Sequence, residues 1–222
     1  MIKSLASIKN IKEASLIAGY NFDIIDIKNI DDGPLGYVGN KEVELISNEL
    51  NNRILSVTAG NSDHPNKDII YERLEFLNFS KIDYIKIGIF DINYLDMHSI
   101  FLKKAFNLNI KTVGVLFADN NIDINIIKKI CKLDYDGLMI DTIKKSSKST
   151  LDIMGDNLIN SFVSECHKIK KFCGLSGSMQ QNTIEYAMKF KSDFIGFRGA
   201  LCSPNSRDNI ESIQCQNIIK II

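Results

Sequence analysis

The hydrophobic residues of this chain gather in short runs that alternate with longer amphipathic segments from one end to the other. Each run has the length of a buried strand, is rich in Ile, Val and Phe, and shows little polar alternation. Segments such as 41–52 and 122–133 lie between the runs and repeat apolar residues at the i, i+3, i+4, i+7 spacing of one helix face. The expected strands are 1–8, 23–28, 54–60, 83–88, 112–119, 137–141, 172–177 and 193–198.

Eight strand–helix pairs in succession predict parallel βαβ units. Eight such units favour a closed (β/α)8 barrel of the TIM type, and an open sheet with six to eight strands is the alternative. No linker rich in Pro or Ser interrupts the series, so we expect a single barrel domain over 1–222. The least regular stretch, 141–171, should hold a loop, a short helix and the sixth barrel helix.

Polar and small residues collect where the expected strands end, which is where barrels of this kind keep their active sites. These positions are Asp26, Lys28, Thr58, Lys86, Asp119, Asp141, 176–178, Arg198 and Gly199. Acidic residues also stand just before strands, where turn or cap roles explain them most simply. They are Asp23, Asp83, Asp136 and Asp193.

Two lysines stand out because they fall inside strands. Side chains alternate along a strand, so Asp26 and Lys28 share one face, and Lys86 lies opposite the isoleucines of its own strand. Those isoleucines suit the helix-facing side, which directs both lysines into the barrel mouth. A lysine is almost never fully buried without a partner, and Asp26 and Asp141 are the candidates. The alternative is that both lysines extend to solvent at the strand ends.

A desolvated lysine beside another cation has a lowered pKa and can attack a carbonyl to form a Schiff base. Lys28 and Lys86, with aspartates interleaved, therefore predict carbonyl chemistry of the aldolase type. The three histidines and five cysteines have no metal-ligand spacing, so we expect no metal site.

The last two expected strands end in turns that contain glycine, GLSGSM and GFRGA. Loops at this place in a barrel often bind phosphate through backbone N–H groups near a helix N-terminus. We expect Gly177, Ser178 and Gly199 to hold a phosphate in this way, with Arg198 as a charged fork. Close packing is the alternative reason for the glycines.

Two loops should border the same mouth. Residues 28–36 contain two glycines and a proline and could form an ordered loop over the site or a plain surface loop. The basic segment 144–150 could bring Lys145 or Lys148 to a second phosphate, or could be solvated.

Composition narrows the class of protein. Lys and Arg total 27 and Asp and Glu total 27, so the net charge is zero, which argues against a nucleic-acid partner. No apolar run approaches the roughly 18 residues that span a bilayer, and the first residues lack the apolar segment of a signal peptide. The five cysteines are scattered and form no CxxC, which is typical of reduced thiols in the cytoplasm. The sequence leaves a homo-oligomer open.

With these residues in hand, the chain resembles the (5-formylfuran-3-yl)methyl phosphate synthases of methanofuran biosynthesis, a family of barrel enzymes. The resemblance covers almost the whole chain, and its motifs occur in the family's order at nearly its spacing. They are DIIDIKN with the following GPLG, DYIKIG, LMIDT with Lys145, and the closing GSM and GFRGALC.

The resemblance implies that two glyceraldehyde 3-phosphate molecules condense to a phosphorylated furaldehyde with loss of phosphate and water, without cofactor or metal. The family's Schiff-base lysine falls on Lys28, and its proton-transferring lysine falls on Lys86. Family acids near the substrate fall on Asp26 and Asp141, and a further lysine falls on Lys145.

The chain departs from the family pattern in loops over the expected site. Ile30 follows Asn29 where the family commonly has Pro, the loop 61–67 is shorter, and the tail after Cys202 lacks a run of glycines. These changes concern substrate closure more than the chemistry. Two further hypotheses stay open: a simpler Schiff-base aldolase on triose phosphates, and a non-catalytic barrel that binds a sugar phosphate.

Overall fold

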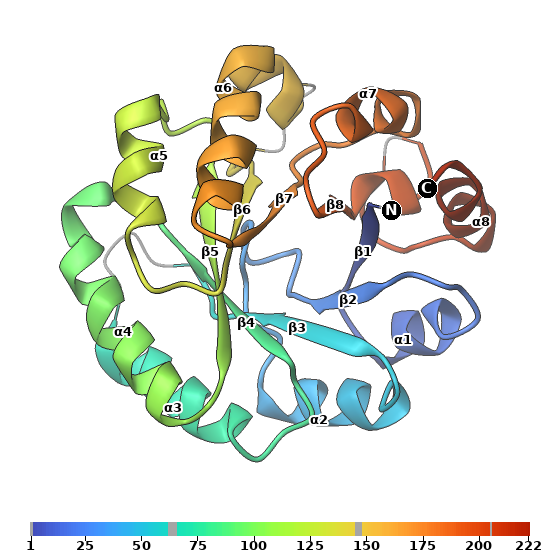
Figure 1. Ribbon diagram of the computed structural model, residues 1–222. Helices are drawn as coiled ribbons and strands as arrows, with labels where there is room; N and C mark the ends of the chain where they lie inside the picture. The colour runs from blue at the N-terminus through green and yellow to red at the C-terminus, as the bar shows by residue number, and fades with distance from the viewer. Residues whose placement is uncertain (1, 62–65, 145–147, 205) are drawn as a thin grey trace.

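A computed structural model describes residues 2–61, 66–144, 148–204 and 206–222. Eight parallel strands close into a barrel in chain order, with β1 paired to β8 (Figure 1). The predicted (β/α)8 barrel is therefore confirmed. The strands are β1 Lys3–Ile8, β2 Ile24–Ile27, β3 Ile54–Thr58, β4 Tyr84–Gly88, β5 Lys111–Phe117, β6 Gly137–Asp141, β7 Phe172–Leu175 and β8 Phe194–Phe197.

Helices surround the barrel and cover the outer faces of its strands (Figure 1). Gly155, at φ +67°, leaves helical geometry inside α6, so this element consists of a short first helix and a longer second one, as expected for this stretch. The helices are α1 Ile11–Ile17, α2 Asn40–Glu49, α3 Lys67–Leu77, α4 Leu95–Asn107, α5 Ile124–Cys131, α6 Thr150–Lys168, α7 Ile184–Met188 and α8 Ser212–Ile221, with short 3₁₀ turns at η1 Ile92–Tyr94, η2 Gln181–Thr183 and η3 Gly199–Leu201.

Strand alternation separates two apolar clusters, because successive side chains point to opposite faces. Ile25 and Ile85 pack in the larger cluster, between the strands and the helices. Ile24 and Tyr84 pack in the smaller cluster, whose other members come from the inward faces of several strands and from the loops that follow strands. The face that carries Asp26 and Lys86 is therefore the inner one, as the alternation predicts.

The acidic residues before the strands have a common role. Each accepts a hydrogen bond from a backbone N–H near the start of the preceding strand, so each ties an odd-numbered strand to the next even-numbered one. The contacts run from Ser4 to Asp23 (2.8 Å), from Leu55 to Asp83 (2.8 Å), from Thr112 to Asp136 (2.7 Å) and from Cys173 to Asp193 (2.7 Å). These carboxylates pin the amino end of the barrel.

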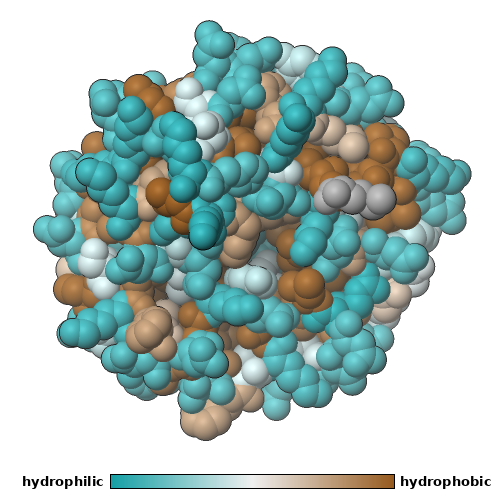
Figure 2. All heavy atoms as spheres, in the orientation of Figure 1, coloured by the Kyte–Doolittle hydropathy of each residue, from teal (hydrophilic) through white to brown (hydrophobic). Residues whose placement is uncertain are grey.

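Surface and thiol properties match a packed globular chain. All five cysteines are free and buried. No helix within the described ranges is both long and apolar enough to cross a membrane. Figure 2 shows polar side chains over most of one face, with apolar surface in separate patches.

Candidate active site

The two lysines singled out in the sequence are both buried inside the barrel. Lys86 is the third residue of β4 and is 2% exposed, and Lys28 directly follows β2 and is 6% exposed. The backbone N–H of Lys28 donates to the carbonyl of Ile8 at 2.9 Å, which fixes the lysine at the carboxyl end of the barrel. Neither lysine extends freely into solvent, so the alternative of two surface lysines does not hold.

Asp26 binds Lys86 and collects donors from three strands around it. Its Oδ2 lies 2.6 Å from the Nζ of Lys86 and accepts the Ser7 hydroxyl at 3.0 Å, and its Oδ1 accepts the Ser56 hydroxyl at 2.7 Å. The carboxylate is completely buried. A buried charge is tolerated only when it is paired and hydrogen-bonded, and both conditions are met here.

Charge and burial move the pKa values of this group in defined directions. Burial by itself raises the pKa of Asp26, but the attraction of Lys86 and Lys28 and the hydrogen bonds from Lys86 and Ser56 outweigh it, so the net pKa is lowered. Burial is the largest cause of the lowered pKa of Lys28; Asp141 opposes it, and Lys86 adds to it by like-charge repulsion. Asp26 is thus held ionised, and Lys28 loses its proton at a lower pH than an exposed lysine does.

Asp141 ends β6 and faces Lys28 across the mouth. Its Oδ2 lies 3.8 Å from the Nζ of Lys28, a loose ion pair, and its Oδ1 accepts the backbone N–H of Thr142 at 2.7 Å. Asp119, at the end of the neighbouring strand, accepts the backbone N–H groups of Ile143 and Lys144 at 2.9 and 2.7 Å, so it holds the loop after β6. Lys145, expected near a second phosphate, lies outside the described residues.

The loop from Lys28 to Gly36 is ordered and folds into the mouth. Asn29 donates to the carbonyl of Gly36 at 2.8 Å, and the Thr58 hydroxyl donates to the same carbonyl at 2.6 Å. Leu35 is fully buried in the inner cluster, close to Gly88 of β4. Only about 20 Å³ of space remains beside Lys28 and Asp141, which is little more than one water molecule needs.

The two glycine turns after β7 and β8 meet at one corner. Ser178 and Gly199 both line a polar cavity of about 890 Å³ there. Gly177 has φ +94°, and a side chain at this position would collide with Thr142 and Thr150, so geometry and space both require glycine. A Cβ at Gly199 would meet only Arg207, at 3.5 Å. There is therefore room for a side chain at position 199 but not at position 177.

Arg198 differs from its expected role. Its guanidinium forms a two-point ion pair with Glu13 at 2.6 and 3.0 Å. Its remaining donors reach the carbonyls of Ser7, Arg207 and Asp208 at 2.8 to 3.2 Å. Every N–H of the fork has a partner inside the protein, so the side chain has none left for a phosphate. Arg198 instead anchors the loop that carries Arg207.

Arg207 is the residue that the sequence reasoning missed. It lines both the corner cavity and the small space beside Lys28 and Asp141. Its buried Nε has no hydrogen-bond partner among the described residues. No motif marks this arginine, which lies in an irregular tail; only the folding of the tail over the barrel, held by Arg198, brings it to the mouth.

One cluster in the described chain has donors that could hold a metal ion: His167, Cys173 and Asp193. The His167 Nε2 lies 3.0 Å from Asp193 and 3.7 Å from the sulfur of Cys173. The carboxylate already accepts the backbone N–H of Cys173, the bond that its three counterparts make elsewhere in the barrel. The cluster lies at the amino end, away from Lys28, and strand pinning explains its geometry.

Comparison with known proteins shows the family of this chain. The 4-HFC-P synthase family matches residues 4–221. A (5-formylfuran-3-yl)methyl phosphate synthase of Methanocaldococcus jannaschii is 30% identical over 94% of this chain and 92% of its own length, and one of Methanococcus aeolicus is 28% identical over 98% of each. The 3-hexulose-6-phosphate synthase of Salmonella typhimurium, at 12% identity and a TM-score of 0.67 over 99% of this chain and 98% of its own, shares the barrel fold. This chain belongs to the 4-HFC-P synthase family.

Proposed function

We propose that this protein is a lyase that condenses two molecules of glyceraldehyde 3-phosphate, through a Schiff base on Lys28, into (5-formylfuran-3-yl)methyl phosphate. The observation that carries the proposal is the buried pair of lysines with Asp26 ion-paired to one of them. The names of the relatives agree with the product. The atoms balance when one phosphate and two water molecules leave.

The amine of Lys28 attacks the carbonyl carbon of the first triose phosphate. The resulting carbinolamine loses water to give the imine, which needs one proton delivered to the leaving oxygen. Burial and the neighbouring Lys86 lower the pKa of Lys28, so a larger fraction is the neutral nucleophile near pH 7 than for an exposed lysine.

Lys86 moves protons in this scheme, and Asp26 holds it in place. The imine acidifies the adjacent C–H, whose loss gives an enamine, and the enamine carbon bonds to the aldehyde carbon of the second triose. Lys86 is the nearest described acid–base group to Asp26, at 2.6 Å, and the serines on either side of the carboxylate fix its direction. Acid–base groups placed in this way contribute roughly 10²–10⁴-fold to rate.

The corner cavity is the proposed phosphate site. Ser178 and Gly199 line the cavity, Gly177 directly precedes Ser178, and Arg207 supplies the cation that Arg198 does not. The Nε of Arg207, which has no partner in the described part of the chain, would then gain an acceptor. Since the space beside Lys28 is about 20 Å³, substrate entry requires the 28–36 loop or the loop after β6 to move aside.

Trapping with borohydride tests the proposal. Incubation with glyceraldehyde 3-phosphate and borohydride should add a fixed mass to the wild type and to Lys86→Ala, but not to Lys28→Ala. Lys104→Ala, on the outer surface, is the matched lysine control and should be trapped like the wild type. Trapping on Lys86 would reverse the two roles, and trapping on neither lysine would rule out the Schiff base.

A spectrum of the reaction separates the remaining alternatives. A conjugated furaldehyde absorbs in the near ultraviolet, whereas a simple aldol product does not. A new band that depends on Lys28 supports the complete reaction. An imine without the band indicates a triose-phosphate aldolase, and unchanged substrate without an imine indicates a binding protein. The free, buried cysteines support a reducing, cytoplasmic location for this chemistry.

A further inference from the structure

A second cavity opens at the amino end of the barrel, opposite the proposed active-site mouth. It measures about 560 Å³ and is lined by residues at or near the starts of the strands, among them Lys3, Ile24, Tyr84, Phe172 and Phe194. Its inner end reaches Ser56 and Lys86. Its volume and apolar walls fall in the range of small-molecule sites, and the phosphate site proposed above lies elsewhere, at the corner beside Gly199.

Glycines in the strands explain why the space is not filled. A Cβ at Gly137 would overlap the ring of Phe172, and a Cβ at Gly174 would overlap the ring of Phe194. Each ring therefore lies against the bare backbone of the preceding strand. Rings held against the wall leave the axis open, where TIM barrels usually pack a layer of branched side chains.

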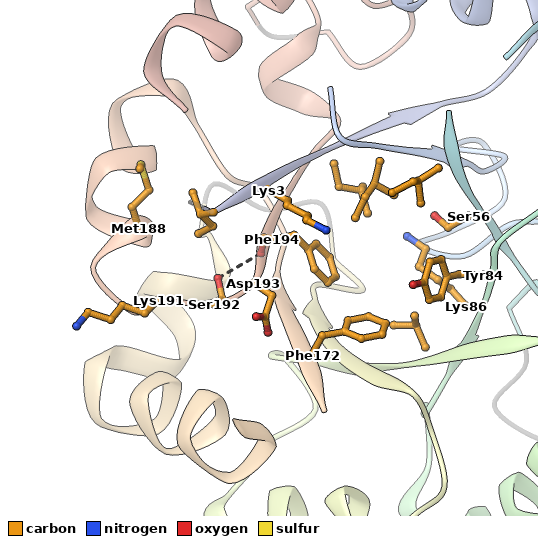
Figure 3. A pocket seen from close by; sticks show the side chains of 15 residues that line it. Lys3, Ser56, Tyr84, Lys86, Phe172, Met188, Lys191, Ser192, Asp193 and Phe194 are labelled. Atoms are coloured by element: carbon orange, nitrogen blue, oxygen red, sulfur yellow. Dashed lines mark hydrogen bonds between the residues drawn. The ribbon is translucent and has the colours of Figure 1, made fainter. Parts of the chain in front are cut away.

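The walls present aromatic surface to an occupant. Tyr84 meets Phe172 edge to face at 5.5 Å, and Phe194 lies 6.3 Å from Phe172. Figure 3 shows these three rings directed into the same space. Aromatic surfaces of this kind favour a flat ring, which can stack or meet them edge on.

Lysines at the rim of the cavity favour an occupant with a negative charge. Lys3 shares the inner face of β1 with Leu5 and points into the cavity, whereas Lys191 points away (Figure 3). Lys111 lies on the inner face of β5 with its Nζ 5.5 Å from the ring centre of Tyr84. Within the described ranges neither Lys3 nor Lys111 has an ion pair. The acid at the rim, Asp193, already accepts the Cys173 N–H and contacts His167.

We propose that this cavity binds a small aromatic anion, with the ring between Tyr84, Phe172 and Phe194 and the negative group at Lys3. An occupant would close the amino end of the barrel beneath Lys86. The proposal does not rest on the reaction proposed above, because its ligand enters from the opposite end and needs no contact with Lys28, although the inner end of the cavity reaches Lys86.

Naphthalene-1-sulfonate is a suitable probe because the chain contains no Trp, whose emission would overlap that of naphthalene most strongly, and the emission of its seven tyrosines can be subtracted. Titration of the full-length protein should show saturable binding. Naphthylmethylammonium, which has the same ring and the opposite charge, should bind at least tenfold more weakly. Lys3→Met should weaken sulfonate binding at least tenfold, and Lys191→Met, the matched control, should leave it unchanged.

Two further variants locate the probe. Val113→Phe should abolish binding by filling the cavity, with the melting temperature checking that the variant folds. Lys3 is exposed at the rim, so the Lys3 and Lys191 comparison stands even if Val113→Phe does not fold. Lys28→Ala should bind the probe normally. Absence of saturable binding, equal affinity for the cation, insensitivity to Lys3→Met, or loss of binding in Lys28→Ala alone would each overturn the proposal.

Discussion

At the scale of single residues, the proposed chemistry depends on the carboxylates that lie beside the two buried lysines. Asp26 lies 2.6 Å from Lys86, whereas Asp141 lies 3.8 Å from Lys28. The tighter ion pair holds Lys86 in place, and the looser one leaves burial as the largest influence on the pKa of Lys28. Because the groups interact, they titrate together, and a measured pKa belongs to the cluster.

Asp141→Asn should shift the acid limb of the kcat/KM profile to lower pH. The reason is that Asp141 raises the pKa of Lys28, and Lys28 attacks only when neutral. The pH of the half-maximal rate is the readout, because the height of the profile also depends on substrate contacts. Asp96→Asn on α4 is the control. A shift to higher pH would contradict the assignment of Lys28 as the nucleophile.

His98 should make the protein less stable in mild acid. Burial lowers its pKa to about 4, from 6.5 in the unfolded chain, so the unfolded state takes up a proton first as pH falls. Neutral His98 contributes ~3 kcal/mol to the unfolding free energy. This contribution is fully present above pH 6.5 and is lost as the pH falls from 6.5 to about 4. Urea unfolding across this range measures it.

The matched variant for this effect is His98→Asn, which keeps a polar partner for the Tyr135 hydroxyl but does not titrate. In this variant the unfolding free energy should change less between pH 6.5 and about 4 than it does in the wild type. Asp26 does not interfere, because its lowered pKa places its own loss of stability below pH 3.8. An unchanged slope in His98→Asn would assign the effect to another group.

At the scale of elements, the tail after β8 shows how a structural residue can serve a site without facing it. Arg198 joins α1, through Glu13, to the carbonyls of the loop that carries Arg207. A buried charge left without its partner is strongly destabilising. The two arginines therefore differ in what their removal should change.

Arg198→Met should cost about 3–5 kcal/mol of unfolding free energy, because Glu13 stays buried without its ion-pair partner. Arg207→Met should leave stability nearly unchanged and raise KM for the phosphorylated substrate. Denaturant melts and steady-state kinetics on both variants give the comparison. Equal stability losses, or a KM effect confined to Arg198→Met, would return the phosphate role to Arg198.

At the scale of the whole molecule, carboxylates link the strands at the amino end of the barrel, and the proposed chemistry lies at the carboxyl end. The four acids before the even-numbered strands repeat one bond around the amino end. The carboxyl end carries the lysines, the ordered loop and the glycine turns. Stability and activity thus fall on opposite faces, as is common in barrels.

Asp83→Ala should lower the unfolding free energy by about 1–3 kcal/mol, because the backbone N–H of Leu55 loses its acceptor in a buried place. Borohydride trapping in the folded variant should persist. Glu44→Ala, an exposed change on α2, is the control and should stay within about 0.5 kcal/mol of the wild type. A loss of trapping with normal stability would mean that the amino end also shapes the site.

The sequence by itself determined the barrel and the place of its lysines. Short apolar runs between amphipathic segments indicate alternating strands and helices, and side-chain alternation directs Lys28 and Lys86 inward because the isoleucines opposite them need the helix-facing side. These are local properties with fixed periods, so they can be predicted without knowing what lies across the barrel.

Only the tertiary structure decided which charges meet. Asp26 binds Lys86 and not its own strand neighbour Lys28, because side chains that share a strand face point alongside one another while the partner two strands away points at them. Arg198 forms an ion pair with Glu13, 185 residues away in the chain, and Arg207 lies at the mouth instead of Arg198. Contacts between residues so far apart in the chain produce no repeating pattern in the sequence. They arise only when the barrel closes and brings these residues together.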